Sequence, residues 1–201
     1  NIFYIFYLSV KNYKNSKLKF KRIDEFIQYK ESDTLVILGA GASINELSKD
    51  DISILNKYDI AGLSYSCVVP MPQTFYFYET PSCHDKNLLD EHAKKLFPEV
   101  LKTGEEKATR CNIWKNSESS CALDFLEIEN FIAINVCHIL ANDTVVIKKI
   151  FRFFDKFKLS KFVLLQKSGS ISAIINFAIL LKYKKVIFIG VDLSNSKYFF
   201  D

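Results

Sequence analysis

The chain alternates short apolar runs with polar or glycine-containing segments, and this pattern predicts buried strands joined by turns and helices. The runs predicted to be strands are residues 35–38, 59–64, 74–78, 161–165 and 186–192. Ile171–Leu181 is a nearly continuous apolar stretch of helical length, which predicts a centrally buried helix. Strand–turn–helix units therefore recur toward both ends of the chain. They predict an α/β fold with a doubly wound, mainly parallel sheet and helices on both faces.

The remaining segments give weaker patterns. Residues 136–140 and 144–150 are compatible with either a helix or a strand. The aromatic residues of 151–157 have helical spacing, which favours the core face of a helix. Residues 103–130 are polar and contain Trp114, the single tryptophan, so we expect a loop or lid over the sheet.

Residues 1–33 form an N-terminal aromatic and basic segment ahead of the predicted α/β domain at 34–201. We interpret it as an edge strand followed by a solvated helix containing Phe26 and Ile27, because charge runs are usually solvated faces. Its alternative role is an interfacial segment on anionic lipid, which makes peripheral membrane contact.

The first strand runs into a glycine turn, which is the strongest functional signal in the sequence. Gly39, Gly41 and Ser43 follow the strand at once, and Ala42 lies between the last two. Glycines let a ligand approach the backbone, and the first N–H groups of a helix favour an anion, so this turn is a candidate nucleotide site. However, Ile44 replaces the third glycine of a dinucleotide fingerprint and no Gly-Lys-Ser/Thr sequence follows. A plain structural turn is the alternative.

Further candidate residues lie where predicted strands end. Ser64, Glu79 and Asp192 lie at or just after the carboxyl ends of three of these strands, at the edge where open parallel sheets bind ligands. Ser168-Gly169 precede the long apolar helix and form a second candidate anion site.

The composition narrows the class of protein. The chain has 201 residues, 49% hydrophobic, and a net charge of +4, which fits a globular domain with an anionic substrate better than nucleic-acid binding. Its five cysteines contain no CxxC pair, and His84 and His92 lack metal-binding spacing, so we expect no metal and a reducing cytoplasm. No apolar run is long enough to span a bilayer. The chain lacks an initial Met and ends just after a predicted strand, so we expect a fragment.

Two segments together resemble the bacterial lipooligosaccharide sialyltransferases, which use a CMP-sialic acid donor. Residues 39–44, GAGASI, are similar to the family motif GNGPSL. Ser168-Gly169 at a helix start, residues 190–192 (GVD) and residues 198–201 (YFFD) are similar to later family motifs and occur in the same order. The resemblance implies a Rossmann-like, GT-A-like variant of the α/β fold.

The resemblance also implies roles for individual residues. The glycine turn and Ser168-Gly169 would hold the cytidine monophosphate, with Ser64 and Glu79 as further polar contacts. Tyr198 would assist the departing phosphate. The sequence departs from the family at Ala40, where the family has asparagine, and at Leu165, where it has arginine. The family's catalytic histidine lies beyond the segment that matches residues 198–201.

The expected activity is therefore transfer of a sialic acid-like sugar from a CMP-activated donor to a cell-surface glycan. An acceptor hydroxyl attacks with the help of a base, and hydroxyl donors stabilise the leaving phosphate without metal or cofactor. We expect a homo-oligomer at the inner face of the membrane, with no nucleic-acid partner. The alternatives are a magnesium-dependent phosphotransfer enzyme related to pyrophosphokinases, using Glu79 and Asp192, and a non-catalytic nucleotide-binding module.

Overall fold

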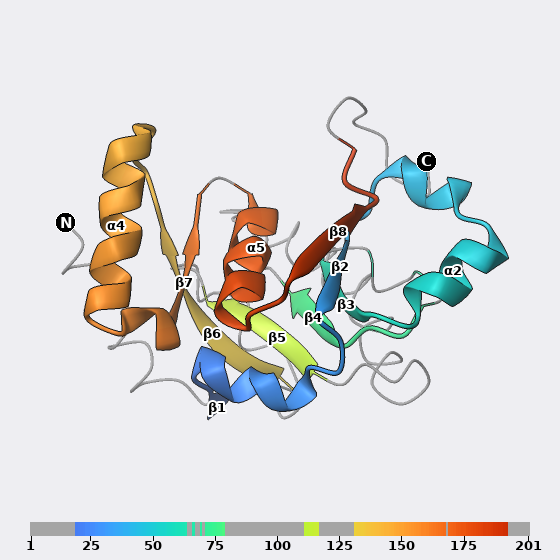
Figure 1. Ribbon diagram of the computed structural model, residues 1–201, viewed down its shortest axis with the longest axis horizontal. Helices are drawn as coiled ribbons and strands as arrows, with labels where there is room; N and C mark the ends of the chain where they lie inside the picture. The colour runs from blue at the N-terminus through green and yellow to red at the C-terminus, as the bar shows by residue number, and fades with distance from the viewer. Residues whose placement is uncertain are drawn as a thin grey trace, which may run out of the picture.

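The computed structural model describes residues 19–63, 66, 69, 71–78, 111–116, 131–167 and 169–192. Within these residues the chain folds into an α/β domain whose strands form one parallel sheet (Figure 1). The strands are β1 (Lys19–Phe20), β2 (Thr34–Leu38), β3 (Asp59–Leu63), β4 (Phe75–Tyr78), β5 (Cys111–Asn116), β6 (Phe131–His138), β7 (Val163–Gln166) and β8 (Lys185–Ile189). The helices are η1 (Ile23–Tyr29), η2 (Ala42–Glu46), α2 (Lys49–Leu55), α4 (Thr144–Lys156), η6 (Leu159–Lys161) and α5 (Ser170–Leu180).

The strand order brings the segments that follow β2 and β8 together at one edge of the sheet. The order is β1-β6-β5-β4-β3-β2-β8, and β7 also pairs with β6. The chain therefore moves outward from β2 through β3, β4, β5 and β6 to β7. It then returns along α5 to place β8 on the other side of β2. The loops that follow β2 and β8 start side by side at the point where the strand order reverses, as in doubly wound folds.

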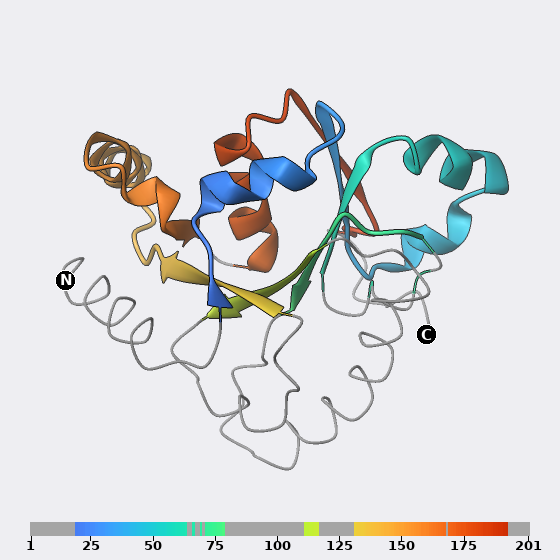
Figure 2. The same cartoon turned by 90° about the horizontal axis from the view of Figure 1, so that it is seen from below.

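Alternating side chains on the strands build a core on each face of the sheet. Leu35 and Ile37 of β2 join the cluster formed with η1 and α5, where Phe26 and Phe177 have ring centroids 5.6 Å apart. Figure 2 shows α5 and η1 on the same side of the sheet. Val36 and Leu38 face the other way and pack with Ile44, Leu55 and their neighbours. Helices thus cover both faces, as predicted.

The helix α4 packs on the face opposite α5, at the β6–β7 end of the sheet. Phe154 of α4 is buried against Cys137 and Leu165, whereas the adjacent Val136 and Leu164 belong to the core under α5. This placement is the one expected for right-handed crossovers, because β6 to β7 and β7 to β8 run in opposite directions across the sheet.

Several predicted segments fold differently from the expectation. Cys111–Asn116 pair with both β4 and β6, so this part of the expected 103–130 lid, which includes Trp114, is an inner strand. The rest of that range lies outside the described residues. The ambiguous segments separate into the strand β6 and the helix α4.

The strand β8 was expected to be buried, but within the described residues it pairs only with β2. Phe188 is 47% exposed as a result. The prediction for residues 1–33 was an edge strand followed by a solvated helix. In the described part of this segment, β1 is short and, among the described strands, pairs with β6. Phe26 is buried in η1 and Ile27 is half exposed.

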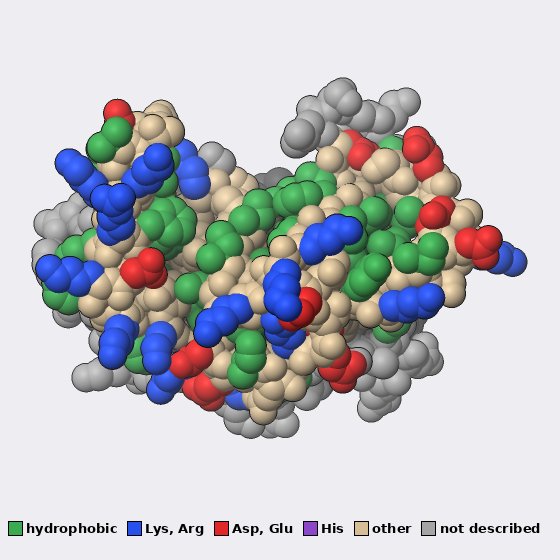
Figure 3. All heavy atoms as spheres, in the orientation of Figure 1, with side chains coloured by type: hydrophobic (Ala, Val, Ile, Leu, Met, Phe, Trp, Pro, Cys, Tyr) green, Lys and Arg blue, Asp and Glu red, His purple; other side chains and the backbone are tan. Residues whose placement is uncertain are grey.

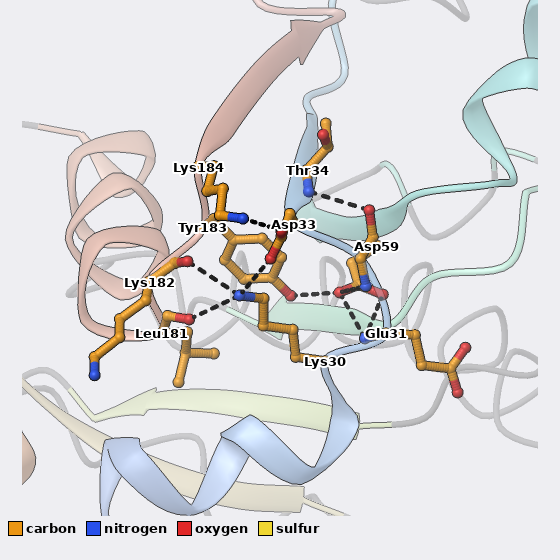
Figure 4. Close-up of polar contacts among 10 residues, drawn as sticks. Lys30, Glu31, Asp33, Thr34, Asp59, Leu181, Lys182, Tyr183 and Lys184 are labelled. Carbon is orange, nitrogen blue, oxygen red and sulfur yellow. Dashed lines mark hydrogen bonds and ion pairs between the residues drawn. The ribbon is translucent and has the colours of Figure 1, made fainter.

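A polar cluster ties the amino-terminal ends of the strands together (Figure 4). The buried Asp59 carboxylate accepts hydrogen bonds from the backbone N–H of Glu31 and Ser32 and from the Tyr183 hydroxyl, the last at 2.7 Å. Lys30 donates to the carbonyl oxygens of Leu181 and Lys182, so the segment before β2 is joined to the turn before β8. The cluster lies at the edge opposite the candidate site and acts as a structural brace.

Candidate functional site

The glycine turn continues the pairing of β2 with β8 beyond the ends of both strands. Gly39 N–H donates to the Ile189 carbonyl and Gly41 N–H to the Gly190 carbonyl, each at 2.8 Å. A Cβ on Gly39 would lie 2.9 Å from the Gly190 carbonyl carbon, which is closer than real Cβ atoms approach backbone. The sequence predicted that these glycines let a ligand approach the backbone. In the structure they permit the close approach of two backbone segments, the one after β2 and the one after β8.

Ser43 and Asp192 form the central contact of the site. Ser43 N–H donates to Asp192 Oδ2 at 2.9 Å, and the Ser43 hydroxyl donates to Asp192 Oδ1. These bonds, with the weaker contribution of the Ala42 N–H, hold the pKa of the Asp192 carboxyl below its usual range. Asp192 is therefore an ionised group fixed at the carboxyl edge of the sheet.

The helix that follows the turn is shorter and tighter than the sequence predicted. Residues Ala42–Glu46 form a single stretch of 3₁₀ helix capped by Gly41, without a side-chain capping bond. Ile44 is buried and lies against Gly190, whose φ of +64° favours glycine. A 3₁₀ segment of this length aligns few peptide dipoles, so it provides little of the field that a long helix offers an anion.

The second candidate anion site begins at Gly169, the N-cap of α5. Gly169 has extended backbone angles and no side-chain capping bond. A Cβ placed on it would meet no atom within 4 Å, so the space beside it is open. Ser172 ties the start of the helix together, because its hydroxyl accepts from Lys167 N–H and donates to the Gly169 carbonyl. The helix α5 has eleven residues, which gives its N-terminus a favourable dipole for an anion.

The structure brings together five of the predicted site residues and separates the others. The residues that meet at the switch point are Gly39, Gly41, Ala42, Ser43 and Asp192. Gly169 lies at the same edge of the sheet but at the start of α5, which Figure 1 shows between β7 and β8. The predicted residues Ser64, Glu79, Ser168 and Tyr198 lie outside the described residues.

Two buried polar groups near the carboxyl end of β3 were not singled out from the sequence. Gln73 Nε2 donates to the Ser66 carbonyl at 2.7 Å, while Gln73 Oε1 and Ser66 Oγ are buried without a hydrogen-bond partner. Both side chains lie against Gly62, where an added Cβ would lie 2.5 Å from Ser66 Oγ. A glycine inside a strand signals close approach of another group, and Gly62 was the signal available for these residues.

No candidate metal centre emerges from the part of the chain that is described. Among these residues no three His, Cys, Asp or Glu side chains gather as a metal site would require. His84 and His92 lie outside that part. The described helices also include none long and apolar enough to cross a membrane.

Comparison with known proteins gives no family for this chain. No family model matches the sequence, and no curated protein gives a significant match.

Proposed function

We propose that this chain is a glycosyltransferase that transfers a sialic acid-like sugar from a CMP-activated donor to a cell-surface glycan. The observation that carries the proposal is the meeting of Ser43 and Asp192 at the switch point of a parallel sheet. Ligands of doubly wound folds bind at this position. The sequence resemblance described above supplies the donor class.

The hydrogen bonds from the glycine turn leave part of the Asp192 carboxylate available to the proposed donor. A carboxylate has roughly four acceptor positions, and the donors of Ala42 and Ser43 occupy three. The remaining position is available to a hydroxyl of the ribose or of the sugar. Asp192 is thus proposed to orient the donor, with the glycine turn holding Asp192 in place.

The donor phosphate is then better placed at the start of α5 than in the glycine turn. A phosphate beside the ionised Asp192 would be repelled, and the N–H groups of Ala42 and Ser43 are already engaged. Gly169 offers open space at the N-terminus of an eleven-residue helix. The positive end of the helix dipole would stabilise the charge that develops on the phosphate as the glycosidic bond breaks. Tyr198, by resemblance, would assist this departure.

The same contact provides the argument for the runner-up, a non-catalytic module. If the turn serves only to fasten β8 to β2, its donors are fully used by the chain's own carboxylate. The magnesium-dependent phosphotransfer alternative receives less support. One of its two candidate carboxylates, Glu79, lies outside the described residues. The other, Asp192, already accepts hydrogen bonds from the glycine turn.

Thermal-shift measurements with CMP, CDP, ATP with magnesium, GTP with magnesium and NAD separate these functions. A ligand at about a hundred times its dissociation constant adds roughly 2.7 kcal/mol, which raises Tm by about 5–10 °C in a domain of this size. A metal-independent shift with CMP supports the proposal. A shift that needs a nucleoside triphosphate and magnesium supports phosphotransfer, and no shift with any nucleotide supports the structural module.

Two variants locate the site once a nucleotide binds. Gly169→Val fills the open space at the start of α5 and should lower CMP affinity without loss of fold. Asp192→Ala, made separately, should lower CMP affinity more than Gly169→Val does, because it removes the acceptor for a hydroxyl of the donor. The matched control is Asp33→Ala, which removes an equal charge from the exposed Asp33 at the opposite edge of the sheet. Affinities should be measured by calorimetry well below each variant's Tm. Normal CMP affinity in both site variants would contradict the placement.

A further inference from the structure

The outward face of α4 is strongly basic. Residues 141–161 contain six Lys or Arg and two Asp. The helix buries Phe154 in the core, and Ile147, Ile150 and Phe151 pack around the same cluster. With 3.6 residues per turn, the opposite face carries Lys149, Arg152 and Lys156, with Lys148 beside them. All four side chains are exposed, and Figure 3 shows Lys and Arg gathered over this helix.

These basic side chains are not neutralised by the described part of the protein. Ion pairs among the described residues include Lys161 with Asp24 and Lys184 with Asp33, but none involves the four basic residues of the α4 face. Asp155 is the one acidic side chain within α4 itself. The face therefore presents a concentrated positive charge to any anionic partner.

Apolar side chains accompany the charge at both ends of the helix. Leu140, just before α4, is 85% exposed, and Val145 and Val146 in its first turn are 58% and 43% exposed. Phe157, at its C-terminal end, is 55% exposed and packs against Phe153, with ring centroids 4.7 Å apart and the rings tilted by 48°. Exposed aliphatic groups beside a basic stripe gain nothing from contact with a phosphate backbone. They are the groups that enter the boundary between lipid headgroups and acyl chains.

We propose that the outward face of α4, with Leu140, docks on an anionic lipid surface. Lys148, Lys149, Arg152 and Lys156 contact the headgroups, while Leu140, Val145 and Phe157 enter the interface. This partner goes beyond the proposed sugar transfer and needs neither donor nor acceptor. It differs from the N-terminal segment considered in the sequence, because α4 belongs to the α/β domain itself.

The position of α4 relates this surface to the candidate site. The helix starts just after the carboxyl end of β6, and Gly169 and Asp192 follow the carboxyl ends of β7 and β8. All the strands are parallel, so these three points lie along the same edge of the sheet (Figure 1). The amino-terminal end of the docking surface, with Leu140 and Val145, therefore lies at the same edge of the sheet as the candidate site.

Vesicle co-sedimentation of the whole chain tests the proposal. Vesicles of phosphatidylcholine alone are compared with vesicles of equal parts phosphatidylcholine and phosphatidylglycerol, at low and high salt. We expect binding to the anionic vesicles, weakened by salt. The variant Lys149→Gln/Arg152→Gln should bind roughly 30-fold more weakly, because two basic contributions are lost. The variant Leu140→Ser/Val145→Ser should also bind more weakly, and its loss should persist at high salt.

The matched control is Lys49→Gln/Lys57→Gln, which makes the same charge change on and beside α2, at the far end of the sheet from α4 (Figure 1). All substituted side chains in both charge variants are exposed, and equal Tm values should confirm that the fold is retained.

Equal loss of binding in both charge variants would overturn the proposal, as would equal binding to both vesicle types. Binding to a single-stranded oligonucleotide through α4, without vesicle binding, would overturn it in favour of a nucleic-acid surface. Because no nucleotide sugar is present, failure here leaves the proposed activity untouched, and the reverse also holds.

Discussion

The backbone N–H of Ser43 lies 2.9 Å from Oδ2 of Asp192, although the two residues are 149 positions apart in the sequence. The contact joins the turn after β2 to the segment after β8, the two neighbouring strands at which the strand order reverses. A glycine turn that would suit a phosphate thus holds an anion supplied by the chain itself. Any phosphate that took the same donors would first have to displace Asp192.

Adding a methyl group to Gly41 should destabilise the domain, whereas the same change at Gly169 should not. A Cβ on Gly41 would lie 2.5 Å from Asp192 Oδ2 and 2.9 Å from the Gly190 carbonyl oxygen. Overpacking of this kind costs about 1–3 kcal/mol. At Gly169 a Cβ meets nothing within 4 Å, so Gly169→Ala should stay within about 0.5 kcal/mol. Urea unfolding of both variants measures the difference. Equal midpoints would show that the turn relaxes freely around Gly41.

Much of the fold could be predicted because its strands are short apolar runs with clear boundaries. Leu35–Leu38 read as a buried strand because both faces of the sheet are covered there, by α5 on one side and Ile44 on the other. Cys111–Asn116 did not, because its mixed polar sequence carries no periodic signal for a strand. The apolar run of β8 predicted burial, but the sequence of the strand does not reveal that, among the described strands, β8 pairs only with β2.

The candidate site was predictable residue by residue but not as an arrangement. Gly39, Gly41 and Ser43 have the chemistry of an anion site, and Asp192 has the chemistry of a ligand at a strand end. Their contact depends on the return of α5 across the sheet, which local sequence does not encode. Gln73 was missed for a different reason, because its partner Ser66 lies in the loop between β3 and β4 and the burial that defines the pair leaves no pattern in the sequence.

Protonation of Asp192 should weaken the join between β2 and β8. The hydrogen bonds from Ser43, and then that from Ala42, lower the pKa of this carboxyl in the folded state. A lowered folded-state pKa contributes stability that is present above the unfolded pKa of about 4 and is lost as pH falls through the folded pKa. Asp192→Asn removes this titration. Its free energy of unfolding should be lower than that of the parent at neutral pH, and the two should converge below about pH 4. Parallel pH profiles measured by urea unfolding would contradict the assignment.

Replacing Gln73 and Ser66 should have opposite consequences, although the two side chains touch the same glycine. Gln73→Leu removes the donor that lies 2.7 Å from the buried Ser66 carbonyl, which keeps its hydrogen bond from the Val69 N–H, so the cost should be about 0.5–1.5 kcal/mol. Ser66→Ala removes a buried hydroxyl that has no partner, so it should be neutral or stabilising. Thermal unfolding of the two variants provides the comparison. A marked loss of stability in Ser66→Ala would mean that a bound water or ligand satisfies the hydroxyl.

Asn176 should be the most sensitive polar position of the mainly apolar helix α5. Its Oδ1 accepts the Leu165 N–H at 2.8 Å, so a buried backbone donor of β7 depends on this one side chain. Asn176→Ala should lower the free energy of unfolding by about 1–3 kcal/mol, because the donor would be left buried without a partner. Ile179→Ala is the matched control on the same helix, where the side chain is 62% exposed and the expected change is within about 0.5 kcal/mol. Amide exchange at Leu165 reports the bond directly. Unchanged protection in Asn176→Ala would show that another group takes over as acceptor.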